Sequence, residues 1–152
     1  MRRTFLKNLM AGLPLAALGT AGMLTANRSA LAADASVKVV YHFVDGTAQA
    51  ARGLANIRNH LRAAPQTRIV VVALADGISF LLAEAKDRNG KPFDTQVAAL
   101  AAQGVEFRVC GNTLQAHDVP TARLLPQATI VPSGVAEIAR LQAEEGFVYL
   151  RP

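Results

Sequence analysis

The chain has 152 residues, of which 51% are hydrophobic and 18% charged, and its formal net charge is +5. After the N-terminal segment described next, about 120 residues remain, enough for one domain with one hydrophobic core, which excludes a second domain. The only cysteine is Cys110, so an internal disulfide is excluded as well.

The first 32 residues have the pattern of a secretory signal peptide. A basic start, MRRTFLK, precedes an uncharged run from residue 8 to 27, and the small-residue cleavage pattern ALA ends at Ala32. The paired arginines resemble a twin-arginine export motif, although Met1 stands where that motif usually has Ser or Thr. An ordinary secretory signal or an uncleaved anchor is the alternative. We expect export to the periplasm, contact with a membrane only during export, and a mature domain at residues 33–152.

Loss of this segment changes the charge balance. Of the 16 basic residues, 12 remain beside the 11 acidic ones, so the mature chain has a net charge of about +1. The high isoelectric point, about 10.0, therefore belongs largely to the predicted signal. The charge gives no reason to expect a nucleic-acid partner.

Past the signal, short apolar runs alternate with segments of helical periodicity. Residues 37–44 and 67–75 are rich in β-branched side chains and predict strands, and the second, continuously apolar run is typical of a strand covered on both faces. Between them, residues 47–63 place Leu54, Ile57 and Leu61 on one face of an amphipathic helix. A short helix is expected at 78–86, followed by a turn at 89–92.

The second half of the chain continues the alternation. A helix that begins at Asp94 or Thr95 is expected to run to residue 103, with Gly104 ending it. A strand at 105–110, a short helix, a strand at 125–131, a helix at 133–145 and a last strand at 147–150 complete the chain. Strands and helices in this order predict βαβ units, and we expect a three-layer α/β/α sandwich with a mostly parallel sheet of about five strands.

Small polar residues follow the predicted strands. In a parallel sheet, ligands bind outside the carboxyl ends of the strands, so these residues are candidates for a binding pocket. They are Asp45, Asp76 and Ser133, together with Cys110 and the residues after it. Helix capping is a sufficient explanation for Asp45, Asp76 and Ser133, but it does not explain the cysteine.

Cys110 ends the third predicted strand. Strand alternation places it on the face of Arg108, the more polar side. Asn112 and Gln115 have the spacing of a capping box, which predicts a helix that starts close behind the cysteine and favours its thiolate. Gly111 allows close approach of backbone N–H groups, and Arg108 is expected to assist electrostatically. The alternative is an inert, buried cysteine that only packs.

The other candidates carry weaker signals. His42 lies near the end of the first strand and is a candidate for the same edge, although a lone histidine on a strand is more often a hydrogen-bonded structural residue. His60 is expected on a helix flank, and His117 follows the short helix after Cys110. Three dispersed histidines and one cysteine predict no metal site. The absence of a G-x-G-x-x-G or Walker motif predicts no nucleotide cofactor, and we expect no cofactor of any kind.

The stretches VYHFVDG, RIVVVALADGISFLL, VEFRVCGNTL and IVPSGVAEIARLQAEEGFVYLRP resemble the DsrE/DsrF-like proteins over residues 37–152. The resemblance implies a compact α/β/α fold and assembly as a trimer or hexamer. It also implies that Cys110 corresponds to the cysteine that accepts sulfur as a persulfide in sulfur-relay members. This chain departs from those members in its export signal, because they work in the cytoplasm.

Two functions follow as hypotheses. The first is an exported, sulfurtransferase-like sulfur carrier. In it, Cys110 is the nucleophile, and Arg108 and the amides of Gly111, Asn112 and Thr113 stabilise its thiolate. His42, Asp45, Asp76 and Ser133 support the pocket, and a periplasmic protein is the sulfur donor or acceptor. The second is a non-catalytic binding or assembly module with a structural cysteine. A redox role is disfavoured, because the chain has no resolving cysteine.

Overall fold

β-branched and aromatic runs form five strands, and the segments of helical periodicity cover them. The computed structural model describes residues 36–152, so the predicted signal peptide lies outside the described residues. The strands are β1 (Lys38–Phe43), β2 (Arg68–Ala73), β3 (Glu106–Cys110), β4 (Ala128–Val131) and β5 (Val148–Leu150). The helices are α2 (Thr47–Ala63), α3 (Phe93–Ala101), α4 (Gly111–Ala116) and α5 (Gly134–Glu145), with the 3-10 helices η1 (Ala75–Leu81) and η2 (Thr121–Arg123).

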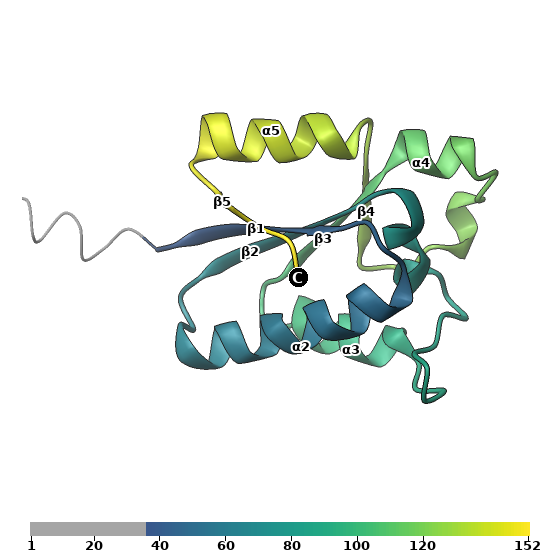
Figure 1. The fold of residues 1–152 in the computed structure, drawn as a ribbon, viewed down its shortest axis with the longest axis horizontal. Helices are drawn as coiled ribbons and strands as arrows, with labels where there is room; N and C mark the ends of the chain where they lie inside the picture. The colour runs from purple at the N-terminus through teal and green to yellow at the C-terminus, as the bar shows by residue number, and fades with distance from the viewer. Residues whose placement is uncertain (1–35) are drawn as a thin grey trace, which may run out of the picture. The chain divides into compact units, whose positions relative to one another are not determined.

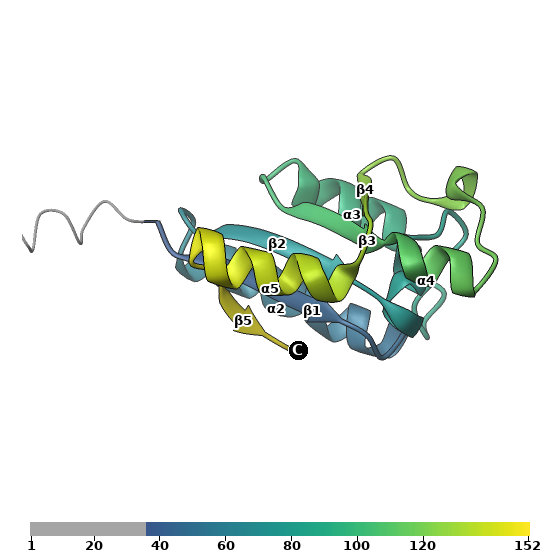
Figure 2. The same cartoon turned by 90° about the horizontal axis from the view of Figure 1, so that it is seen from above.

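All five strands are parallel and lie in the order β4-β3-β2-β1-β5. The helices α2 and α3 lie on one side of the sheet, and α5 lies on the other (Figures 1 and 2). The structure therefore confirms the predicted α/β architecture with a parallel sheet of five strands. No helix within residues 36–152 is long and apolar enough to cross a membrane.

The two faces of the sheet carry different cores because successive strand residues point to opposite sides. Towards α2 and α3, the strands contribute a large cluster that includes Tyr41, Phe43 and Phe107. Towards α5, a smaller cluster is built on Val40, Val70 and Val72 of the strands and on α5. The α5 face is thus the less apolar one, and it is the face onto which β3 directs Cys110.

Most elements lie where the sequence predicts them, and α2 has the predicted bounds. The prediction of a helix at 78–86 is wrong, because the 3-10 helix η1 ends at Leu81. Beyond it, the chain forms isolated antiparallel bridges from Leu82 to Leu124 and from Lys86 to Pro92. Those bridges use backbone groups that a helix would need. The fourth strand is also shorter than expected, because it begins at Ala128 and not at Leu125.

Close backbone contact joins η1 to the end of β1. A Cβ atom added to Gly77 would lie 2.1 Å from the carbonyl oxygen of Phe43. Only glycine allows this approach, which brings the loops after β1 and β2 together at the carboxyl edge of the sheet.

Candidate functional site

Cys110 lies at the junction of β3 and α4. It is the last residue of the strand and the N-cap of the helix, which begins at Gly111. The thiol is free, and the residue is 5% exposed. The capping box expected from Asn112 to Gln115 does not form, because the helix starts one residue before Asn112 and has no side-chain cap.

The start of α5 packs directly against this cysteine. A Cβ atom added to Gly134 would lie 3.1 Å from the Cβ of Cys110 and 3.0 Å from the side chain of Leu74, so a larger residue at this position would crowd both neighbours. Ser133 caps the helix through its side-chain oxygen, which accepts a hydrogen bond from the N–H of Ala136 at 3.4 Å. The cap fixes the first turn of α5, whose Gly134 N–H is directed at the sulfur of Cys110.

Thr113 adds donors from the α4 side. Its hydroxyl oxygen accepts the N–H of Ala75 at 3.1 Å, which leaves the hydroxyl proton for the sulfur of Cys110. The backbone N–H groups of Thr113 and Asn112 face the sulfur as well. The site therefore gathers hydrogen-bond donors from two helix starts and from a side chain that is itself 8% exposed.

These donors act on the pKa of the thiol. Burial of Cys110 is the largest single influence, and it raises the pKa because it disfavours the charged form. Hydrogen bonds from Gly134, Thr113 and Asn112 act in the opposite direction and together outweigh it, so the pKa is lowered. The arrangement chemically favours a thiolate, which is the nucleophilic form of cysteine.

Arg108 has carboxylate partners instead of a role at the sulfur. Its guanidinium binds Glu106 on its own strand and Glu137 in the first turn of α5, and it is not among the groups that shift the pKa of Cys110. These pairs close into a ring of alternating charges on the α5 face. The ring runs through Arg108, Glu137, Arg140, Glu145, Arg68 and Glu106.

The ring joins α5 to the sheet close to the cysteine. Arg108 is two residues before Cys110 on β3, and Glu137 is three residues after Gly134 on α5. The side chains of Arg108 and Glu137 are 14% and 12% exposed, so this pair is mostly shielded from water. Arg108 therefore contributes to the site by holding α5 in place, and not through its own charge at the sulfur.

The predicted residues at the ends of β1 and β2 do not reach the sulfur. Nδ1 of His42 is hydrogen-bonded to the hydroxyl of Tyr149 at 2.8 Å, and both carboxylate oxygens of Asp45 accept from Arg151 at 2.9 Å. Asp76 is exposed. In the described chain, no hydrogen bond or ion pair joins any of the three to Cys110. The structure gathers Cys110, Gly111, Asn112, Thr113 and Ser133, and leaves the others apart.

Gly134 is the functional residue that sequence reasoning missed. It appears in the Pro132-Ser133-Gly134 stretch after the fourth strand, which strand-end reasoning did single out through Ser133. The parallel order of β3 and β4 as neighbours was the missing information, because it brings this stretch to the cysteine.

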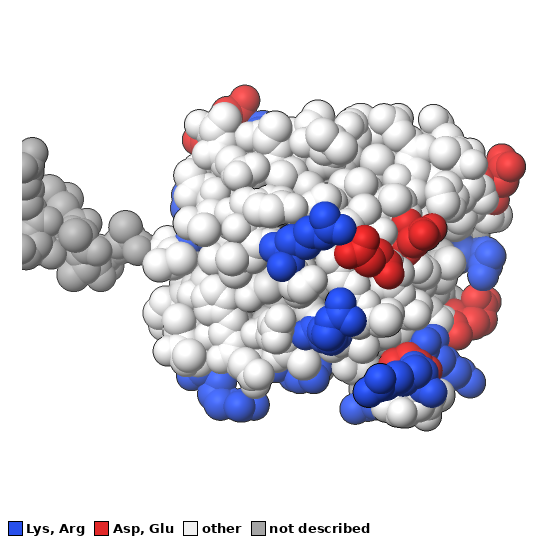
Figure 3. All heavy atoms as spheres, viewed as in Figure 1, with Lys and Arg blue, Asp and Glu red and all other residues white. Residues whose placement is uncertain are grey.

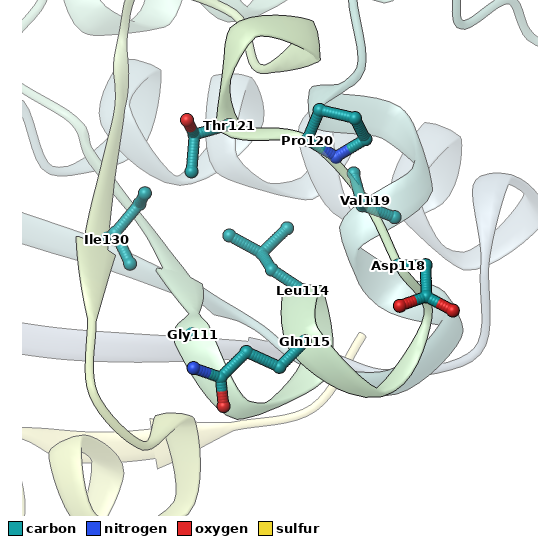
Figure 4. Close-up of a pocket in the computed structure, with 8 residues that line it drawn as sticks. All are labelled: Gly111, Leu114, Gln115, Asp118, Val119, Pro120, Thr121 and Ile130. Atoms are coloured by element: carbon teal, nitrogen blue, oxygen red, sulfur yellow. The ribbon is translucent and has the colours of Figure 1, made fainter.

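A pocket of about 410 Å³ lies on the side of α4 and β4, and Cys110 is not among its lining residues (Figure 4). Gly111, the residue after Cys110, forms part of its wall, and Leu114 points across it towards Ile130. Most of the lining surface is apolar, with Asp118 and Thr121 among the polar residues. The pocket offers a largely apolar surface next to Gly111 on which a partner or substrate can rest.

No three His, Cys, Asp or Glu side chains within residues 36–152 lie close enough together to hold a metal ion.

The sequence profile of the DsrE/DsrF-like family matches residues 19–151, a range that begins inside the predicted signal peptide. Comparison with curated proteins gave no match.

Two solved structures are similar to this one. MTH1491 of Methanobacterium thermoautotrophicum, a protein of unknown function, shares 33% sequence identity over 77% of this chain and 100% of its own, with a TM-score of 0.68. The ychN protein of E. coli has a TM-score of 0.61 at 14% identity, covering 77% of this chain and 98% of its own. The second likeness shows a shared fold alone.

Proposed function

The chain belongs to the DsrE/DsrF-like family, and on that premise we propose that it is an exported sulfur carrier that holds sulfane sulfur on Cys110 as a persulfide. The family is associated with sulfur relay. The single observation that carries the proposal is the convergence of Gly134, Thr113 and Asn112 donors on one free thiol, which lowers its pKa.

The proposed chemistry transfers sulfur without net oxidation. The Cys110 thiolate attacks the outer sulfur of a persulfide donor, R–S–SH, so that a new S–S bond forms and the donor's S–S bond breaks. The donor leaves as a thiolate, RS⁻, and Cys110 carries the outer sulfur with its proton. A partner thiolate then attacks that sulfur, takes it as its own persulfide and releases Cys110 as the thiolate.

The donors around Cys110 suit both steps. They stabilise the thiolate before attack and again when it leaves after transfer, so Cys110 is a nucleophile in the first step and a leaving group in the second. The apolar pocket beside Gly111 is where we place the donor or acceptor protein, which on this proposal is periplasmic.

A mass measurement tests the carrier. The protein is treated with polysulfide under mild conditions, and its peptides are analysed without reduction. We expect a gain of one or more sulfur atoms on the peptide that contains Cys110 and none in the Cys110→Ser variant. Polysulfide treatment that leaves the Cys110 peptide unchanged would show that the residue is no sulfur carrier.

The burial of Cys110 favours a second candidate, a non-catalytic binding or assembly module. Alkylation separates the two functions. A carrier must expose its thiol on the time scale of turnover, so the native protein should react with iodoacetamide, and faster as the pH rises through the lowered pKa of Cys110. A thiol that reacts only after denaturation would favour the module.

Self-association is part of the proposal, with a trimer or hexamer as the expected form. At the β5 edge of the sheet, exposed apolar side chains support it, because an uncovered strand edge is a common site of pairing. The exposed residues on this strand are Val148, Tyr149 and Leu150. Light scattering of the purified protein measures the size of the assembly.

Export is a separate part of the proposal. N-terminal sequencing of the exported protein tests whether the signal peptide is cleaved near Ala32.

A further inference from the structure

A second pocket lies on the opposite side of the sheet from α5. It has a volume of about 510 Å³ and is formed by the first half of α2 and by the loop that joins η1 to α3. This volume falls within the usual range for small-molecule sites. Its lining residues are Thr47, Ala48, Ala51, Arg52, Ala55, Lys86, Asp87, Arg88 and Asn89.

Unpaired positive charge distinguishes this pocket from the rest of the described surface. Most basic side chains of residues 36–152 bind a carboxylate, an amide or a backbone carbonyl, as Arg123 binds Glu84 and Arg58 binds Gln96. The exceptions in this part of the chain, which have neither a hydrogen bond nor an ion pair, are Arg52, Lys86, Arg88 and Lys91. The first three line the pocket, and Lys91 lies on the same loop.

The one acid in the lining, Asp87, leaves the three lining cations with a net positive charge. The carboxylate of Asp87 is turned into its own loop, where it accepts the backbone N–H groups of Asn89 at 2.8 Å and Lys91 at 2.9 Å. The first turn of α2 also contains no acidic residue. Figure 3 shows several basic side chains at the lower right of the molecule, with acidic side chains among them, where Figure 1 places this loop.

The floor of the pocket is apolar. Ala48, Ala51 and Ala55 recur at helical spacing and present one methyl-lined stripe of α2. Arginine guanidinium groups bind planar oxyanions through paired hydrogen bonds, and lysine adds a point charge. An apolar stripe opposite unpaired cations is complementary to a molecule that is itself apolar on one side and anionic at its ends.

We propose that this pocket binds a small organic anion that has an apolar body and at least two negatively charged groups of the phosphate, sulfonate or carboxylate type. Binding places the apolar body on the alanine stripe and the charged groups at Arg52 and Arg88. The site is independent of Cys110 and of the proposed sulfur chemistry.

Nuclear magnetic resonance titration of the ¹⁵N-labelled protein tests the site with three probes. Naphthalene-1,5-disulfonate has both the body and the charges, pyrophosphate has only charges, and 1-naphthalenemethanol has only the body. We expect saturable shifts of the Thr47, Ala48 and Asn89 amides with the disulfonate, with a Kd below about 1 mM. Pyrophosphate should bind about tenfold more weakly, and the neutral probe should cause no saturable shift.

Matched variants separate a built site from general charge attraction. Arg88→Gln and Arg52→Gln each remove a lining cation. Each should weaken disulfonate binding at least about tenfold, because the complex loses one hydrogen bond between charged groups. Arg58→Gln removes the same charge from the same helix, outside the lining, and should change binding less than about twofold.

Three results would overturn the proposal. They are the absence of saturable shifts at the pocket amides, an equal loss of affinity in Arg58→Gln and Arg88→Gln, and equal binding of the neutral probe. Cys110→Ser should bind the disulfonate unchanged, so this assay and the polysulfide assay fail or succeed separately. The substituted arginines are exposed, and the dispersion of each spectrum verifies that the variants are folded.

Discussion

Replacing Thr113 with valine removes one hydroxyl group and keeps the shape of the side chain. That hydroxyl accepts the N–H of Ala75 at 3.1 Å and also acts on the sulfur of Cys110. Because Thr113 is only 8% exposed, water cannot easily take its place. Leaving the Ala75 N–H without a partner should lower the free energy of unfolding by about 1–3 kcal/mol. The pKa of Cys110 should rise, since a hydrogen bond to the thiolate is lost while burial remains.

The two effects have separate measurements. Ultraviolet absorbance of the thiolate, followed against pH, gives the pKa of the thiol, and subtraction of the Cys110→Ser spectrum removes the tyrosine contribution. Because Cys110 is the only cysteine, the remaining signal belongs to it. Urea denaturation gives the free energy of unfolding. Thr113→Ser is the matched control, since it retains the hydroxyl and should retain the low pKa.

An unchanged titration of Cys110 in Thr113→Val would refute the assignment of this hydroxyl to the thiolate. If stability fell without any rise in the pKa, Thr113 would be only an anchor for the backbone of Ala75. If Thr113→Ser raised the pKa as much as Thr113→Val, the lost methyl packing and not the hydroxyl would control the thiol.

Three further predictions concern stability, each measured by urea denaturation. The free energy of unfolding of the wild type should rise relative to that of Cys110→Ser as the pH increases from the lowered pKa of the folded thiol towards about 8.5, the pKa of an unfolded thiol. A difference between the two proteins that does not change with pH would contradict the lowered pKa. Arg108→Met should cost about 2–3 kcal/mol, somewhat less than the loss of a fully buried pair. Arg68→Met removes a ring arginine whose side chain is 40% exposed, and it should cost under about 1 kcal/mol. Equal losses in the two variants would show that burial does not determine how much each ion pair of the ring stabilises the protein. Gly77→Ala should cost about 3 kcal/mol or more, because the new Cβ meets the backbone of Phe43. Gly90→Ala, with open space but a positive φ, should cost about 1 kcal/mol, so a larger loss there would count against close contact as the cause at Gly77.

Local patterns made the fold predictable. The helix at 47–63 repeats apolar residues at helical spacing, and its bounds agree with the structure because nothing distant overrides them. The segment 78–86 shows the opposite case. Its residues allow a helix, but bridges from Leu82 to Leu124 and from Lys86 to Pro92 draw the backbone away. Leu124 is remote in sequence from Leu82, so no local pattern announces that bridge, whereas Lys86 and Pro92 are close in sequence and face each other across the predicted turn.

The candidate site divides in the same way. Strand alternation correctly placed Cys110 and Arg108 on one face, because the period of two is a property of the strand itself. The expectation that Arg108 serves the thiolate does not agree with its partners in the structure. Glu106 and Glu137 hold its charge, and Glu137 comes from a helix whose position depends on the whole sheet.

By itself, the sequence determined that one thiol ends a strand, that a glycine follows it and that a helix begins beside it, since these are properties of neighbouring residues. Tertiary structure alone decided what surrounds that thiol. The parallel pairing of β3 with β4 brings Gly134 to Cys110, and Thr113 reaches it while anchored to Ala75. The physical reason is that hydrogen bonds to a buried sulfur act over a few ångströms in space, whatever the separation along the chain.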